Sequence, residues 1–365
     1  MSTPTPTQLS KSGDGDPGET IAEVPLTHAS LPRRAAPFTL LAFVVIGVGL
    51  QQFAGLGPVA AGVLAALGYA VAITAWSRAV EGARKSFDRF VTAVVTGAFL
   101  LAMLPLVSVL WTVVDLGRHR LDADFFNNST IGVDITEAGA HHAIFGTLIV
   151  TGIAALMSVP IGIMTAIYLI EYGRGRLARS ITFFVDVMTG IPSIVAGLFV
   201  VALFETLYGP GTRMGFMGSI ALSVLMIPIV VRATEEMLKI VPNELREASY
   251  ALAVPKWRTI LKVVLPTALA GIASGVTLAI ARVIGETAPL LLAVGMTDGD
   301  NFDAFNDRMA TLPVFTYSLY RSPGLDGQDA IDLAWSAALM LIIIVMVLNL
   351  VARLVARLFA PKTRA

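Results

Sequence analysis

The most constraining feature of the sequence is a series of apolar runs, because a membrane-spanning helix needs about 20 such residues. Hydrophobic residues make up 55% of the chain and charged residues only 14%, against roughly 25% charged residues in an ordinary soluble domain. A soluble fold cannot hide that much apolar surface. The chain is therefore predicted to be an all-α polytopic membrane protein with about eight transmembrane helices. The eight runs lie near residues 38–53, 59–76, 90–114, 143–170, 181–208, 216–231, 268–294 and 334–355.

The basic residues test this arrangement independently, because cytoplasmic loops of membrane proteins are enriched in Lys and Arg. With a cytoplasmic N-terminus, twenty of the 26 Lys and Arg residues fall in inner segments and five in outer segments, while Arg282 lies within a helix. Along the chain, segments rich in Lys and Arg alternate with segments poor in them, as expected for alternating inner and outer loops. Both termini are therefore predicted to face the cytoplasm.

Composition divides the chain into three parts. Residues 1–36 are rich in Ser, Thr, Pro and Gly, which predicts a disordered cytoplasmic tail. Residues 37–78 hold an extra pair of transmembrane helices, although the Gly-Leu-Gly-Pro segment at 55–58 fits a tight hairpin equally well. Residues 85–360 hold the other six helices, which form the main transmembrane domain.

Missing residues and motifs exclude several chemical functions. The chain has no Cys, so it has no disulfides, thiolate zinc site or cysteine nucleophile. It lacks the Gly-x-x-x-x-Gly-Lys phosphate loop, so it does not hydrolyse ATP itself, and it lacks His-Glu-x-x-His. The adjacent His141 and His142 diverge on a helix, so no metal site is expected. The chain is predicted not to be an enzyme and to hold no cofactor of its own.

Two long outer loops, residues 116–142 and 296–331, are acidic. They are either solvated connections or a docking surface for an extracytoplasmic partner. Their length favours the docking surface.

The one long inner loop, residues 232–266, is predicted to contain a helix–turn–helix. Pro242 and Asn243 can begin the first helix, with Asn243 as its cap, and Val254-Pro255 interrupts it. Residues 256–264 form a second amphipathic stretch.

The same loop carries Glu247-Ala248-Ser249, then Ala253, and finally Leu265-Pro266. This spacing resembles the EAA loop of ATP-binding-cassette (ABC) importer permeases, which reads Glu-Ala-Ala, then Gly, then Leu-Pro. In that family the loop forms a coupling helix that sits in a groove of the ATPase subunit. The resemblance implies that the chain couples to an ATPase through Glu247, Ala248, Ser249, Ala253, Lys256, Leu265 and Pro266.

The loop departs from the family pattern at two positions. Ser249 replaces an alanine, and Ala253 stands where glycine is usual. Both residues are small, so close approach to a partner survives, but a glycine-only backbone angle at Ala253 is not expected to survive.

Three further segments resemble the permeases of phosphate-specific ABC importers: Gly-Thr-Leu at 146–148, Thr-Gly-Ile-Pro-Ser-Ile-Val-Ala-Gly at 189–197, and Ile-Ala-Arg-Val-Ile-Gly-Glu-Thr-Ala-Pro-Leu at 280–290. The Gly-Glu-Thr-Ala-Pro-Leu ending is similar to the PstA-type subunit of that family and less so to its PstC-type partner. The resemblance covers about residues 87–359. It implies a type I importer permease core of six helices, with the tail and first two helices outside it.

This resemblance also implies a cellular role. The chain would be a permease for inorganic phosphate in a bacterial plasma or inner membrane. Its partners would be a second, PstC-type permease, two ATPase subunits that hold ATP and magnesium, and an extracytoplasmic phosphate-binding protein. Three alternatives remain open: a permease for another oxyanion, a gradient-driven secondary transporter, and a membrane scaffold or sensor without transport.

Charges within the apolar runs are the candidate transport residues. Arg282 and Glu286 are four residues apart and are predicted to share one face of the seventh helix. They are either a structural ion pair or a transport pair, in which Arg282 attracts an anion and Glu286 limits its binding. The resemblance favours transport, and the predicted path also includes Thr287. Asp186 in the fifth run joins the path and could pair with Arg282 or with Ser and Thr on a neighbouring helix.

Two prolines are candidate gating positions. Pro192 is predicted to break the fifth run, and Pro289 to kink the seventh. Kinked helices without a gating role are common, so these prolines are either gating positions or structural kinks.

Overall fold

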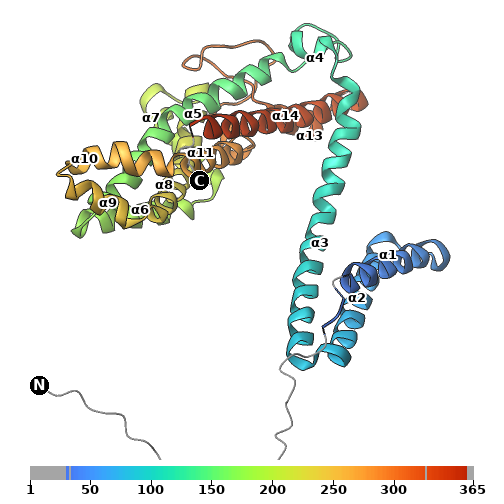
Figure 1. Cartoon of the computed structure of the whole chain (residues 1–365). Coiled ribbons are helices and arrows are strands. Elements are labelled where there is room, and N and C mark those ends of the chain that lie inside the picture. Colours follow the sequence, from blue (N-terminus) through green and yellow to red (C-terminus); the bar gives the residue numbers. More distant parts are fainter. Residues whose placement is uncertain (1–29, 33, 325–326, 360–365) are drawn as a thin grey trace, which may run out of the picture. The chain divides into compact units, whose positions relative to one another are not determined.

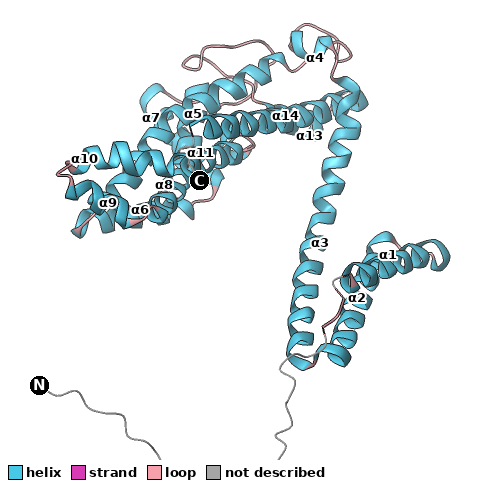
Figure 2. Cartoon of the chain, viewed as in Figure 1, coloured by secondary structure: helices cyan, strands magenta, loops and turns pink. Residues whose placement is uncertain are grey.

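The computed structural model describes residues 30–32, 34–324 and 327–359, and the regular elements in these ranges are all helices (Figure 2). The chain divides into two compact units, Met1–Ser108 and Val109–Ala365, and each is described by itself. The predicted disordered tail, residues 1–36, lies almost entirely outside the described residues.

The first unit contains α1 (Ala35–Ala54), α2 (Pro58–Glu81) and most of α3 (Ala83–Gly117) (Figure 1). Gly55 ends α1 with a φ of 66°, and Pro58 begins α2, where a missing N–H costs nothing. The two helices approach closely at Gly47, where a Cβ atom would lie 3.0 Å from the Cβ of Ala65. α1 and α2 are therefore joined by a short turn at residues 55–57.

A buried carboxylate holds the turn between α2 and α3. Glu81 accepts two hydrogen bonds from the Arg89 guanidinium, at 2.6 and 2.9 Å. It also accepts from the Ser77 hydroxyl at 2.7 Å and from the Leu31 N–H at 2.8 Å. These four donors offset the cost of removing a carboxylate from water.

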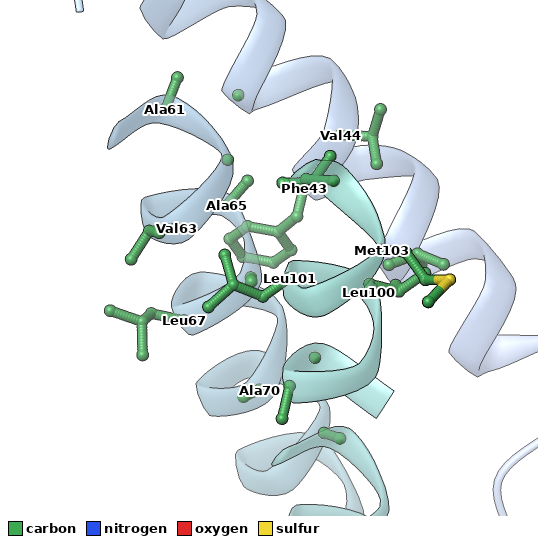
Figure 3. Close-up of a pocket in the computed structure, with 18 of the residues that line it drawn as sticks. Phe43, Val44, Ala61, Val63, Ala65, Leu67, Ala70, Leu100, Leu101 and Met103 are labelled. Atoms are coloured by element: carbon green, nitrogen blue, oxygen red, sulfur yellow. The ribbon is translucent and has the colours of Figure 1, made fainter. Parts of the chain in front are cut away.

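Beyond this turn, the helices of the first unit enclose an apolar groove of about 670 Å³. Figure 3 shows Phe43 of α1, Ala65 and Leu67 of α2, and Leu101 and Met103 of α3 around it. No charged side chain lines the groove, so it offers nothing to hold an anion.

The second unit begins within α3 and contains the remaining helices (Figure 1). They are the 3-10 turn η1 (Arg118–Arg120), α4 (Ala123–Asn127), α5 (His141–Ile167), the π-turn η2 (Tyr168–Tyr172), α6 (Gly175–Thr189), α7 (Ser193–Tyr208), α8 (Gly215–Ile240), α9 (Asn243–Ala251), α10 (Lys256–Thr259), the π-turn η3 (Ile260–Val264), α11 (Leu265–Val283), α12 (Ala288–Ala293), α13 (Leu312–Arg321) and α14 (Gly327–Phe359).

The centre of this unit is the pair α5 and α8. The hydroxyl of Ser219 on α8 donates to the carbonyl of Val150 on α5 at 3.0 Å, and Ser223 donates to Ala154 at 3.4 Å. Small hydroxyl residues allow two membrane helices to approach and satisfy their own polar groups at the contact. α8 is thereby the most buried of the spans among the described residues.

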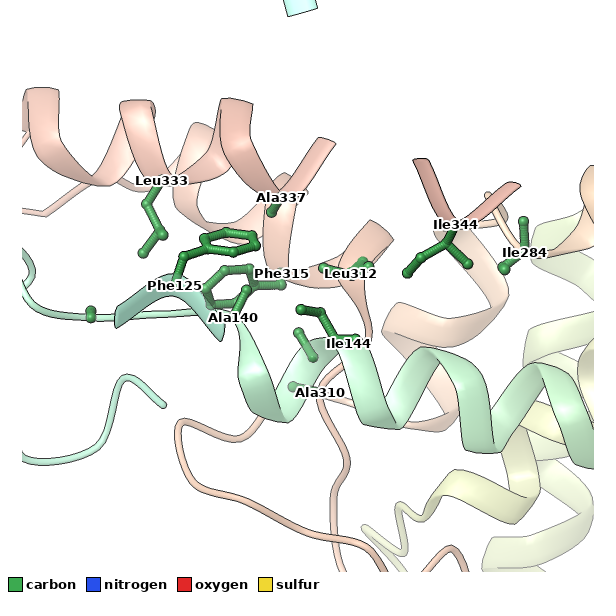
Figure 4. Close-up of a cluster of buried hydrophobic side chains, with 12 residues drawn as sticks. Phe125, Ala140, Ile144, Ile284, Ala310, Leu312, Phe315, Leu333, Ala337 and Ile344 are labelled. Atoms are coloured by element: carbon green, nitrogen blue, oxygen red, sulfur yellow. The ribbon is translucent and has the colours of Figure 1, made fainter. Parts of the chain in front are cut away.

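A packed apolar cluster closes the end of the unit that carries α4 and α13. Figure 4 shows the rings of Phe125 and Phe315 against Leu333, with Leu312 beside them. All four side chains are fully buried. The Leu312 N–H donates to the Thr147 hydroxyl at 2.7 Å, which ties α13 to α5. The loops at this end are therefore anchored to a packed cluster.

The described residues include seven helices long and apolar enough to span a membrane, or eight spans if the bent pair α6 and α7 counts as one. The predicted all-α class with about eight spans is confirmed. α6 and α7 are bent by 107° at residues 190–192, where Pro192 predicted a break.

Two predicted helix ends are wrong. The sixth run continues as α8 to Ile240, so residues 232–240 of the predicted inner loop are helical. The seventh run does not continue to residue 294, because α11 ends at Val283 and α12 starts separately at Ala288. Gly285 and Pro289 both disfavour an uninterrupted helix at this point.

Candidate functional site

The predicted helix–turn–helix is present, and we refer to residues 243–259 (α9, the turn and α10) as the hairpin. The first helix starts at Asn243 and the second at Lys256. Asn243 does not cap α9, because Pro242 occupies that position; the Asn243 side chain accepts from Arg246 at 3.3 Å. The second helix is no separate element, since it continues through η3 into α11 as one span, Lys256–Val283.

The turn of the hairpin has the geometry that glycine usually provides. Ala253 has a φ of 56°, the Ala253 N–H donates to Tyr250 at 2.9 Å, and the Val254 N–H donates to Ser249 at 3.2 Å. This is the hydrogen-bond pattern of a Schellman C-cap, with alanine at the left-handed position. The expectation that Ala253 loses this backbone angle is wrong, because alanine can adopt it at a cost of about 1–2 kcal/mol.

The other departure from the motif, Ser249, braces the hairpin. Its hydroxyl lies 2.8 Å from the hydroxyl of Thr259 on α10, and both residues are buried. An alanine at position 249 could not make this contact. Serine therefore provides a polar link between α9 and α10.

A buried ion pair anchors the hairpin to the end of α5. Arg246 on α9 lies 3.0 Å from the carboxylate of Glu171 in η2, and the two side chains are only 13% and 5% exposed. The same guanidinium donates to the carbonyls of Leu238 and Val241 at the end of α8. This pair was not predicted from the sequence. Glu171 stands alone at the end of an apolar run, and that isolation was the one available signal.

Lys256 adds a second contact to the same turn. Its ammonium donates to the carbonyl of Glu171 and lies 4.8 Å from the centre of the Tyr172 ring. Lys256 thus points toward the body of the protein, and its contact with an ATPase stays a prediction.

The outer surface of the hairpin remains open. Glu247 and Ala248 are exposed, and Leu252 at the turn is 79% exposed. Leu265 and Pro266 are half-buried directly after the π-turn η3, where the α-helical hydrogen-bond pattern is already interrupted and a proline is accommodated. Of the predicted coupling residues, Glu247, Ala248 and Ala253 are therefore exposed on the hairpin, whereas Ser249 and Lys256 brace it from inside.

Arg282 lies in the last turn of α11, and the chain then leaves the helix. Glu286 follows the helix end, so the prediction that Arg282 and Glu286 share one helical face is wrong. Gly285 and Pro289 supply the physical reason, as described above for the helix end. Arg282 is exposed and Glu286 is half-buried, and no ion pair joins either of them to another described residue.

The residues after the break pack against the other broken segment. Thr287 precedes α12, and Pro289 lies in the first turn of α12, so it starts a helix where a kink within one was predicted. Gly197 in α7 lets this turn approach, because a Cβ there would lie 2.7 Å from the Pro289 Cα. α7 and α12 therefore touch near their N-terminal ends. Each of these helices follows an interruption in its apolar run.

Asp186 does not meet Arg282 in the described structure. It forms an ion pair with Arg232 on α8, and Arg232 also pairs with Glu235 at 2.6 Å. Two carboxylates around one guanidinium give this cluster a net negative charge. Arg232 was predicted to lie in a loop, so the cluster was not predicted, although opposite charges three residues apart directly after an apolar run were a readable signal.

The two acidic loops are joined to each other. The Thr130 N–H donates to the Asp298 carbonyl at 3.1 Å, and the His141 ring lies 2.9 Å from the Asp300 carboxylate. Within the first loop, hydrogen bonds from the Thr136 N–H and hydroxyl lower the pKa of Asp134. Among the described residues, no group of three or more His, Asp or Glu could hold a metal ion.

Comparisons with known proteins show which family this chain belongs to. Residues 158–365 match the family model described as "Binding-protein-dependent transport system inner membrane component". The chain is 48% identical over 256 residues to the phosphate transport system permease protein PstA 1 of Mycobacterium tuberculosis, covering 69% of this chain and 83% of that protein. It is 38% identical to the corresponding protein PstA of Pasteurella multocida, covering 66% of this chain and 84% of that protein.

Solved structures give the same fold. A bacterial alginate ABC transporter in complex with its periplasmic protein aligns with a TM-score of 0.52 at 15% identity, covering 76% of this chain and 97% of the aligned chain. At that identity the likeness concerns the fold alone.

Proposed function

The chain belongs to the binding-protein-dependent transport system inner membrane components, among the PstA permeases, and we propose that it carries inorganic phosphate through the membrane as a subunit of an ABC importer. It is a multi-pass protein of the inner membrane. The proposal includes cytoplasmic termini, which place the hairpin in the cytoplasm and the joined acidic loops outside.

The observation that carries the proposal is the unbroken helical path from the hairpin to Arg282. The span Lys256–Val283 has 28 residues, so it is about 40 Å long. It begins at the hairpin, with its exposed turn, and ends at the break beside Arg282. A displacement of the hairpin would therefore move the end of α11 as part of one rigid element.

At the far end of this element, Arg282 has the charge and freedom that an anion path needs. Its guanidinium is exposed and has no carboxylate partner among the described residues. Glu286, beyond the break, would keep anion binding weak, since conduction requires release as well as entry. Thr287 offers a hydroxyl next to this position. Asp186 would act on the path only through Arg232.

The partners in this proposal follow the family. Two ATPase subunits, with ATP and magnesium, would bind the exposed hairpin surface around Glu247, Ala248 and Ala253. A PstC-type permease would complete the path beside Arg282. A phosphate-binding protein would dock on the loops joined by Thr130 and Asp298, and would supply most of the affinity.

The test is phosphate uptake by the purified importer in vesicles that contain ATP. Arg282→Ala should abolish uptake while the complex still assembles, because the path loses its free cation. Arg179→Ala, which removes an exposed arginine from α6, is the matched control and should transport normally. Wild-type uptake by Arg282→Ala would refute the assigned path.

Two further arms of the same assay separate the open alternatives. Uptake driven by a proton gradient without ATP would indicate a secondary transporter. Preferential uptake of sulfate or molybdate over phosphate would indicate a permease for another oxyanion.

A further inference from the structure

A second groove lies at the foot of the hairpin, outside both the transport path and the exposed coupling surface. It has a volume of about 340 Å³ and runs between the end of α5 and the start of the α10–α11 span. Both π-turns contribute to it. Its lining includes Met164, Tyr168, Tyr172, Trp257, Ile260 and Leu261.

The groove lies at the level of a membrane surface. The span His141–Tyr172 ends at it, and the span Lys256–Val283 begins at it. Tyr and Trp concentrate at this level, because their rings are apolar while their polar atoms reach water. Tyr172 and Trp257 thus have the positions of interfacial aromatic residues.

The hairpin does not cover the groove. Thr259 contacts Ser249 of α9, so this side of α10 is occupied. Trp257 and Leu261 are each two residues from Thr259, about 200° around a helix, and therefore point away from α9. Both side chains are 55% exposed, and Met164 across the groove is 70% exposed.

Two cations stand next to lining residues in the sequence, since Arg258 follows Trp257 and Lys262 follows Leu261. Arg258 and Lys262 are exposed, and neither has a carboxylate partner in the part of the chain that the structure describes. The Arg258 guanidinium lies 5.4 Å from the centre of the Trp257 ring, at the edge of the apolar lining. Lys256 is already engaged by Glu171 and Tyr172. An apolar groove with cations next to its lining residues matches a molecule with an acyl chain and a negative headgroup.

We propose that this groove binds an anionic phospholipid of the leaflet on the hairpin side. One acyl chain lies along Met164, Trp257 and Leu261, and the headgroup phosphate is held by Arg258 and Lys262. Free phosphate shares the headgroup chemistry, but it has no part that would fill the apolar lining. The bound lipid would support the base of the hairpin next to its anchor at Glu171.

The experiment uses the assembled importer in phosphatidylcholine nanodiscs with a small amount of phosphatidylglycerol that carries a photoreactive group in its acyl chain. After illumination, label should map to the peptides that contain Trp257, Leu261 and Tyr172. Arg258→Gln combined with Lys262→Gln should lower this labelling about 25-fold, since each basic residue at an anionic surface contributes roughly fivefold. Arg84→Gln combined with Lys85→Gln removes two exposed charges from the first unit and should leave the labelling unchanged.

Salt provides a measurement that needs no variant. Raising the ionic strength to about 1 M should weaken labelling of the wild-type importer, because it screens the headgroup contacts. Millimolar inorganic phosphate at constant ionic strength should not. Equal labelling by a phosphatidylcholine probe, displacement by phosphate, or cross-links from the groove to another subunit in place of lipid would each overturn the proposal.

Discussion

The two ends of the span Lys256–Val283 are built in opposite ways. At the hairpin end, polar groups pair with one another: Arg246 with Glu171, Ser249 with Thr259, and Lys256 with the Glu171 carbonyl. At the other end, Arg282 is exposed and without an ion-pair partner among the described residues. Under the proposed function, the hairpin end transmits force and must keep its shape, whereas the Arg282 end meets the anion and must keep a charge available.

This contrast predicts distinct failures at the two ends. Substitutions at the hairpin should separate ATP hydrolysis from uptake or loosen the hairpin. A substitution at Arg282 should abolish transport while the complex still assembles.

The largest effect is expected at the exposed surface of the hairpin. Glu247→Lys reverses a charge that faces the proposed ATPase, and Ala253→Trp adds bulk at the turn. Each should reduce phosphate uptake to background while ATP hydrolysis continues without stimulation by substrate. Uptake and hydrolysis are measured together in the same vesicles, and normal substrate-stimulated hydrolysis in both variants would contradict the coupling role.

The next effect concerns the anchor of the hairpin. Arg246→Ala leaves the buried Glu171 carboxylate without its cation, which costs about 3–5 kcal/mol for a buried pair. Hydrogen exchange of the α9 amides in the assembled importer should become much faster. The control is Arg246→Ala combined with Glu171→Leu, which removes both charges and should restore part of the protection. No recovery would show that the arginine acts through its other hydrogen bonds.

A smaller loss is expected at the hydroxyl pair. Ser249→Ala removes the hydrogen bond between α9 and the buried Thr259 hydroxyl and leaves that hydroxyl only its 3.5 Å contact with the Pro255 carbonyl, which costs about 0.5–1.5 kcal/mol. Exchange in α9 should accelerate less than in Arg246→Ala. Thr259→Ser keeps a hydroxyl in place and should resemble the wild type; equal exchange in Ser249→Ala and wild type would mean that the brace contributes nothing.

The smallest effect has the opposite sign. Ala253→Gly should stabilise the hairpin by about 1 kcal/mol, because glycine adopts a positive φ without the steric cost that alanine has. Protection of the α9 amides should rise slightly. A decrease would mean that the greater freedom of glycine in the unfolded chain outweighs the strain at position 253.

The sequence was sufficient for features that depend on local pattern. Eight apolar runs gave the spans, and the turn at Val254-Pro255 gave the hairpin. Pro192 marked the bend between α6 and α7. In each case the signal and the structure lie within the same short segment.

The sequence was insufficient where a structural feature depends on contacts between distant segments. Arg246 and Glu171 are 75 residues apart, so their pairing has no local signature. The spacing of Arg282 and Glu286 suggested one helical face, whereas the break between them follows from Gly285 and Pro289. Ala253 takes a glycine-like angle because the hydrogen bonds of the hairpin compensate its strain, and a residue name alone does not show that.

The π-turn η3 affects the direction in which Arg282 points. The Leu265 N–H bonds to the Ile260 carbonyl five residues back, so this turn holds one residue more than an α-helical turn would. Every residue after it is rotated by about 100° relative to a regular helix that starts at Lys256. Removal of one residue from η3 would thus turn the guanidinium a quarter of the way around α11, more than 25 Å from the deletion. The direction in which the arginine points is set near the membrane surface, where the helix begins.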